Sequence, residues 1–143
     1  MLQKISLPAF KIVLSILGAV IVFTGLNRAL GGIRTLGWQG TTDFLQILSE
    51  RDYLIHDSHT RFLGGVWAAF GLALLIAPLN LRAFRPVLFF IFAVIFIGGL
   101  ARFTAMRPDI VFGRDILGSL VAELVLMPIL MLWLSRAVAP SAR

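Results

Sequence analysis

Four long uncharged runs constrain what this chain can fold into more than any other feature of its sequence. They cover residues 12–27, 62–81, 86–101 and 116–135, and Glu123 is the only charge inside them. A membrane-spanning helix needs about 20 mostly apolar residues. The second and fourth runs meet that length outright. The first and third reach it when the flanking lysine and arginine side chains extend to the headgroups.

The run count predicts an all-α integral membrane protein, a four-helix bundle. The expected helices span about residues 9–28, 58–79, 85–104 and 115–137, and together they form a single domain over residues 1–143. Lys4 and Lys11 ahead of the first run also suit a cleaved signal peptide. The run is long for a signal core, however, and no clean small-x-small cleavage site follows it. We therefore expect it to be the first span.

Composition supports lipid as the solvent and excludes several classes of site. The chain is 59% hydrophobic and only 14% charged, whereas soluble domains are about half apolar and a quarter charged. Without cysteines there are no disulfides or thiolate ligands, and two histidines argue against structural zinc. The net charge of +6 resides on side chains that flank apolar runs, which is typical of membrane helices. We expect no nucleic acid, metal or cofactor.

The connection between the first two spans is the only long one. Its first half is rich in glycine, and the Thr41-Thr42-Asp43 stretch resembles a helix start. Phe44, Ile47, Leu48, Leu54 and Ile55 then recur at roughly helical spacing. The pattern predicts a short amphipathic helix at the membrane interface in this first outer loop, over about residues 42–55. The alternative is an irregular loop.

Charge distribution suggests an orientation. Four spans place both termini on one side, together with the second connection. That side carries basic residues and no acidic one: Lys4, Lys11, Arg82, Arg85, Arg136 and Arg143. The two sides have nearly equal Lys and Arg counts, but both lysines precede the first span, which usually dominates orientation. We expect both termini to be cytoplasmic.

With this topology, several costly polar residues gather in the outer leaflet. The candidate ligand-binding residues are Asn27, Asp57, His59, Arg61, Arg102 and Glu123. Glu123 lies on the order of 10 Å along the helix from Asp115. A charge at that depth costs about 2.5–3.5 kcal/mol, so it needs a partner inside the bundle. Arg102 is the best candidate, because Gly98 and Gly99 before it allow a neighbouring helix to approach.

These residues also have purely structural interpretations. Arg102 and Glu123 are equally well explained as a buried pair that locks two helices. Asp57 and Arg61 have the i,i+4 spacing of a helix ion pair, and Asp57 or Ser58 could cap the helix. His59 is as consistent with an ordinary interface residue as with a ligand or proton carrier.

Small residues and a proline indicate packing rather than a site. Gly64, Ala68 and Gly71 follow the spacing of close helix contacts. Pro128 removes the N–H that would bond the Leu124 carbonyl, which predicts a kink in the fourth helix beside Glu123.

Three motifs in combination resemble a known family. They are Asp57-Ser58-His59 with Arg61-Phe62 and Gly64, the Gly98–Arg102 stretch, and Ala122-Glu123-Leu124. They resemble an uncharacterised DUF family of small bacterial four-helix membrane proteins, distantly similar to DoxX-like proteins. The resemblance runs from the first helix to the fourth, and the glycine-rich stretch near Arg34 departs from it. It implies a multi-pass protein of the bacterial inner membrane and no established activity.

Three functions follow as hypotheses. In the first, a polar outer-leaflet pocket lined by His59, Arg102 and Glu123 and walled by Phe62, Trp67 and Phe103 binds a lipid, quinone or fatty acid. In the second, the polar cluster is structural, and the chain is an accessory or assembly subunit of a larger membrane complex, or a homo-oligomer. The third is an enzyme using Glu123 and His59 as acid and base. No nucleophile motif, metal set or phosphate loop supports the enzyme, so we assign no catalytic residue.

Overall fold

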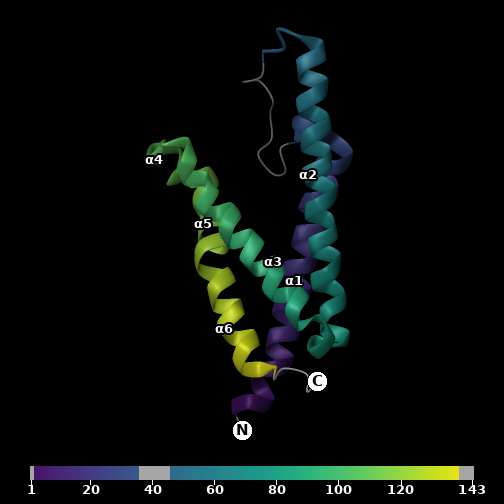
Figure 1. Cartoon of the computed structure of the whole chain (residues 1–143), viewed down its shortest axis with the longest axis vertical. Coiled ribbons are helices and arrows are strands. Elements are labelled where there is room, and N and C mark those ends of the chain that lie inside the picture. The colour runs from purple at the N-terminus through teal and green to yellow at the C-terminus, as the bar shows by residue number, and fades with distance from the viewer. Residues whose placement is uncertain (1, 36–45, 139–143) are drawn as a thin grey trace. The chain divides into compact units, whose positions relative to one another are not determined.

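The structure is a computed structural model that describes residues 2–35 and 46–138 (Figure 1). Within these residues it is helical, without strands. The helices are α1 (Leu2–Gly31), α2 (Glu50–Ile76), α3 (Leu81–Ala101), α4 (Pro108–Val111), α5 (Arg114–Val121) and α6 (Met127–Ala137). Short 3-10 turns follow the first three of them, at Gly32–Thr35, Ala77–Leu79 and Arg102–Ala105. A π-helical turn, Ala122–Leu126, joins α5 to α6 and is called the π-turn below.

Four stretches of the described residues are long and apolar enough to cross a membrane, which confirms the predicted count. They are Leu7–Thr35, Glu50–Leu79, Leu81–Ala105 and Arg114–Ala137. Large apolar side chains are exposed on each, such as Ile16, Phe62, Phe90 and Leu132. Contiguous apolar surface of this kind is unusual on a soluble protein and suits contact with lipid. The chain is thus a multi-pass, all-α membrane protein.

The chain forms two compact units. The α1–α2 unit comprises Val13–Ile76, and the α3–α6 unit comprises Met1–Ile12 with Ala77–Arg143. The expectation of one domain over the whole chain stays a prediction.

Small residues bring the two helices of the α1–α2 unit into close contact. A Cβ added at Gly25 would lie 2.4 Å from the Ala68 backbone nitrogen, and one at Gly64 would lie 2.4 Å from that of Ala29. Gly71 meets Val22 in the same way, at 2.5 Å. Rising positions in α1 meet falling positions in α2, so the helices are antiparallel. The predicted packing role of this small-residue stripe is confirmed.

In the α3–α6 unit, α3 packs against α6. Both helices bury regularly spaced apolar side chains: Leu88, Ile91, Phe92 and Ile95 on α3, and Met127, Leu130 and Leu134 on α6. Phe10, from the first turns of α1, lies edge-on to Trp133 with ring centroids 5.2 Å apart. Arg85 contacts Val138 and Arg102 contacts Glu123, so the α5–α6 segment runs antiparallel to α3.

The separate amphipathic helix expected over residues 42–55 is not what the structure contains. Residues 42–45 lie outside the described part, and 46–49 have no regular structure. Residues 50–55 are the first turns of α2, which begins at Glu50 rather than near residue 58. The reason is local: the Ser49 hydroxyl accepts the Asp52 N–H at 3.3 Å, and Glu50 and Asp52 favour a helix N-terminus.

Candidate functional site

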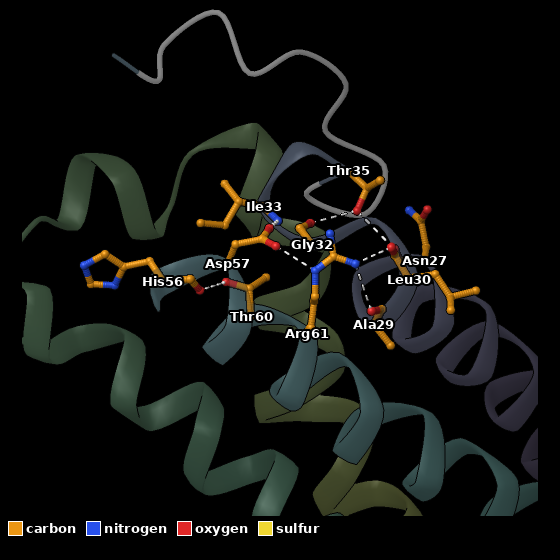
Figure 2. A network of polar contacts seen from close by, with 10 residues as sticks. All are labelled: Asn27, Ala29, Leu30, Gly32, Ile33, Thr35, His56, Asp57, Thr60 and Arg61. Atoms are coloured by element: carbon orange, nitrogen blue, oxygen red, sulfur yellow. Dashed lines mark hydrogen bonds and ion pairs between the residues drawn. The ribbon is translucent and has the colours of Figure 1, made fainter. Parts of the chain in front are cut away.

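A polar cluster fastens the C-terminal end of α1 to α2 (Figure 2). Arg61 Nε donates to Asp57 Oδ2 at 2.6 Å, and Asp57 Oδ1 accepts the Ile33 N–H at 2.7 Å. Arg61 Nη1 donates to the backbone carbonyls of Leu30 and Ala29. The last carbonyls of a helix have no intrahelical N–H donor. Here the Arg61 guanidinium donates hydrogen bonds to two of them. We call Asp57, Arg61 and their backbone partners the α1-end clamp.

Glycine is required where the chain passes under the clamp. Gly32 has a φ of +65°, in the left-handed region, and an added Cβ would lie 1.9 Å from Asp57 Oδ1. The Thr35 hydroxyl donates to the carbonyls of Gly32 at 2.9 Å and Asn27 at 3.1 Å. Asn27 thus joins the cluster through its backbone oxygen, as Figure 2 shows.

The clamp confirms the i,i+4 ion pair and changes the predicted cap. Asp57 does not cap the start of its own helix. It accepts from the backbone of the 3-10 turn that follows α1, across the α1–α2 contact. Asp57 is the one charged residue classed as buried in the described chain, with 7% of its surface exposed. Both carboxylate oxygens of Asp57 accept hydrogen bonds, from Arg61 and from the Ile33 N–H. Asp57 therefore has a structural role in this arrangement.

Arg102 and Glu123 form the predicted pair within the α3–α6 unit. Arg102 Nε and Nη2 each donate to one carboxylate oxygen of Glu123 at 2.6 Å, a bidentate arrangement. Their side chains are 35% and 13% exposed. An added Cβ at Gly99 would lie 2.8 Å from Glu123 Cβ, which confirms the close approach there, whereas Gly98 faces open space.

The backbone around Glu123 is irregular. Glu123 belongs to the π-turn, which closes with the Met127 N–H donating to the Ala122 carbonyl. Pro128 follows at the start of α6 and has no N–H to continue the ordinary pattern. Such turns bend helices and are frequent at functional sites. The sequence predicted a bend here but not its form.

His59 lies at a different kind of surface. A hollow of about 660 Å³, called the α2 hollow below, is lined by Glu50, Arg51, Leu54, Ile55, Ser58 and His59. His59 belongs to the α1–α2 unit, whereas Arg102 and Glu123 belong to the α3–α6 unit. Their convergence in one pocket with Phe62, Trp67 and Phe103 therefore stays a prediction. His56 is exposed, and its carbonyl accepts the Thr60 hydroxyl at 2.9 Å.

A third ion pair lies outside the spans. Arg107 donates from Nε to Asp109 Oδ1 at 3.0 Å and from Nη2 to Asp109 Oδ2 at 2.7 Å. Both side chains are well exposed, and the hydrogen bonds from Arg107 hold the pKa of Asp109 below its ordinary value. Among residues 2–35 and 46–138, no cluster of histidine and carboxylate side chains has a metal-binding arrangement.

Sequence reasoning missed several residues that shape these sites. Ile33 enters through its backbone N–H, which no side-chain pattern reveals. Gly32 carried a usable signal, because a glycine just after a helix often adopts the left-handed conformation. Arg51, Leu54 and Ile55 were assigned to the interface helix instead of to the hollow beside His59.

The residues of both ion-paired clusters fall inside a single family match. The family described as "Domain of unknown function (DUF4345)" matches residues 9–134. The chain belongs to the DUF4345 family. No curated protein and no solved structure matches it. The DUF4345 match includes the α1-end clamp, the Arg102–Glu123 pair and the α2 hollow, and it assigns no activity to any of them.

Proposed function

We propose that this DUF4345 protein binds an amphiphile, such as a lipid, a quinone or a fatty acid, at the α2 hollow. In this proposal the membrane is a bacterial inner membrane, both termini are cytoplasmic, and the hollow opens at the outer leaflet. The ligand's polar head contacts His59 and its neighbours, and its tail lies along the apolar surface of the spans.

The observation that carries this proposal is the mixed lining of the hollow. Leu54 and Ile55 are apolar and exposed, while Arg51, Ser58 and His59 offer hydrogen-bond donors beside them. Ligand sites typically combine an apolar lining with a few polar groups. The lining residues here lie along one face of α2, and the hollow of about 660 Å³ is open rather than enclosed.

The remaining candidate residues have supporting roles. Asp57 and Arg61 direct their hydrogen-bonding groups at each other and at α1, and Asn27 joins them through its carbonyl. They therefore position the end of α2 that carries His59. Arg102 and Glu123 belong to the α3–α6 unit and satisfy each other's hydrogen bonds, so this proposal gives them no contact with the ligand of the α2 hollow.

Blocking the hollow tests the proposal. The Ile55→Trp variant places a bulky ring in it, and His59→Ala removes its polar contact. Leu72→Trp is the matched control, since Leu72 is also exposed on α2 but does not line the hollow. Mass spectrometry of organic extracts from the purified protein should show an amphiphile retained by wild type and Leu72→Trp and reduced at least fivefold in the other two. Equal retention by all four proteins would overturn the proposal.

A second candidate function is an accessory or assembly subunit, or a homo-oligomer, in which the polar groups are structural. One observation favours it. Among residues 2–35 and 46–138, no buried side-chain nitrogen or oxygen lacks a hydrogen-bond partner. In that case, no amphiphile is retained by any of the four proteins, and the large exposed apolar faces serve a protein partner instead.

A further inference from the structure

A second hollow lies in the α3–α6 unit and is separate from the proposed amphiphile site. Its volume is about 260 Å³. It is lined by the start of α1, the start of α3 and the end of α6: Leu7, Lys11, Leu79, Asn80, Leu81, Arg82, Ala137 and Val138. All of these residues belong to the same compact unit. We call it the basal hollow.

The charged side chains of the basal hollow are both cations. Neither Lys11 nor Arg82 forms an ion pair within the described residues. The acidic residues of this unit are Asp109, Asp115 and Glu123. Glu123 pairs with Arg102 at the C-terminal end of α3. The basal hollow lies at the N-terminal end of α3, where Arg85 contacts Val138. These two ends are about 25 Å apart at the α-helical rise of 1.5 Å per residue, so among residues 77–138 the Arg102-paired carboxylate of Glu123 does not neutralise the hollow.

The helix ends add to this positive potential. Asn80 is the N-cap of α3, and its side chain accepts the Ala83 N–H at 3.2 Å. The positive end of the α3 dipole therefore faces the same space as Lys11 and Arg82. The end of α6 would contribute the opposite sign, but Arg85 Nε donates to the Val138 carbonyl at 3.1 Å. Arg85 is held there by the Phe89 ring, 4.9 Å away.

The remaining lining of the basal hollow is apolar. Leu7, Ala137 and Val138 form part of its wall, and Leu79, 84% exposed, extends from its edge. A free anion needs only the cations, whereas a phospholipid also uses an apolar edge for its acyl chains. Both features occur here at the ends of spans, where headgroups lie.

We propose that the basal hollow binds the phosphate group of an anionic phospholipid, with Lys11 and Arg82 as its ligands and the chains lying past Leu79. This site is independent of the amphiphile proposed for the α2 hollow. It assigns the cations at the terminal side of the protein to a defined headgroup site and not only to general attraction by the leaflet.

The test compares phosphatidylglycerol with phosphatidylcholine bound to the whole protein in mixed-lipid nanodiscs, by native mass spectrometry. The preference for phosphatidylglycerol should fall about fivefold for Lys11→Gln or Arg82→Gln and further in the double variant. Arg136→Gln, which removes an exposed cation near the end of α6 outside the hollow, should stay within twofold of wild type. The charge-keeping variant Lys11→Arg with Arg82→Lys should retain the preference.

The outcomes separate the sources of phosphate. An equal loss with Arg136→Gln would mean diffuse attraction to the leaflet and would overturn the site. Binding of inorganic phosphate by the detergent-solubilised protein, with no preference for phosphatidylglycerol, would assign the hollow to a soluble anion and overturn the lipid. Melting temperatures of all variants show whether a loss reflects unfolding, and the charge-keeping variant remains decisive where a glutamine variant unfolds.

Discussion

The α1-end clamp and the Arg102–Glu123 pair use the same chemistry, an arginine against a carboxylate, in different ways. Arg102 and Glu123 come from different helices and use both carboxylate oxygens and two guanidinium nitrogens on each other. Asp57 and Arg61 come from one helix and divide their hydrogen bonds between each other and the backbone beyond α1. The Arg102–Glu123 pair is self-contained, whereas the clamp side chains also hold backbone groups at the end of α1.

This difference governs what happens when charges are removed. Removing both members of a self-contained pair leaves no polar group without a partner, and replacing such a pair with apolar residues is often neutral. Removing both members of the clamp leaves the Ile33 N–H and the carbonyls of Ala29 and Leu30 without side-chain partners. The bonds to the two carbonyls are exposed, so the cost falls mainly on the half-buried Ile33 N–H, and an orphaned buried donor costs about 1–3 kcal/mol.

The largest effect is expected from breaking the self-contained pair. Arg102→Leu leaves Glu123, only 13% exposed, without its counter-charge and should lower the free energy of unfolding by about 3–5 kcal/mol. Glu123→Leu should cost less, because Arg102 is 35% exposed and can extend to the headgroups. The double leucine variant should melt close to wild type in detergent.

The clamp gives the matching experiment. The Asp57→Leu and Arg61→Leu double variant should remain about 2–3 kcal/mol less stable than wild type, because the half-buried Ile33 N–H stays orphaned. If this double recovers as fully as the Arg102–Glu123 double, the two clusters are equivalent and the comparison fails. If the amphiphile of the α2 hollow is lost with the clamp, its positioning role gains support.

Effects of similar size or smaller are expected at the glycines beneath the two clusters. Gly32→Ala forces a side chain into a left-handed backbone and against Asp57, and should cost about 2–3 kcal/mol. Gly99→Ala meets Glu123 Cβ at 2.8 Å within an ordinary helix and should cost about 1–2 kcal/mol. Gly65→Ala and Gly98→Ala, which face open space, are the controls. A larger loss of melting temperature in Gly99→Ala than in Gly32→Ala would contradict the role given to Gly32 in the clamp.

The smallest effect belongs to the exposed pair, Arg107 and Asp109. A carboxylate whose folded-state pKa is lowered adds stability above its unfolded pKa and loses it as the pH falls through the folded value. Because both groups are exposed, Arg107→Gln should leave the melting temperature unchanged within error. It should raise the pKa of Asp109 toward the ordinary value in an NMR titration. An unmoved pKa would show that Arg107 does not hold this carboxylate.

Much of the fold was predictable because a membrane restricts the choices. The uncharged runs predicted four spans, and those spans are present in the described residues. Glu123 required a cationic partner within the membrane, and Arg102 was the arginine placed to reach it, so the sequence was enough to predict this ion pair. Gly64, Ala68 and Gly71 predicted a close helix contact through their spacing alone.

The clamp and the start of α2 depended on information that spacing does not carry. Asp57 reaches a backbone N–H beyond α1 because Gly32 turns the chain with a positive φ. The periodic residues from Phe44 to Ile55 suggested a separate helix. Instead, Ser49 caps the start of α2, so residues 50–55 form the first turns of α2. Whether His59, Arg102 and Glu123 share one pocket depends on contacts between units, which no local pattern determines.

The π-turn has a consequence for reading the lengths of related sequences. A turn closed between residues five apart holds one residue more than an α-helical turn, and one residue corresponds to about 100° of rotation. A relative with one residue fewer between Glu123 and Met127 would form an uninterrupted helix. With α6 still packed on α3, its carboxylate would be rotated about 100° away from the arginine at the end of α3. The residue count of the fourth span, and not only the presence of Glu and Arg, would then tell which relatives can form the pair.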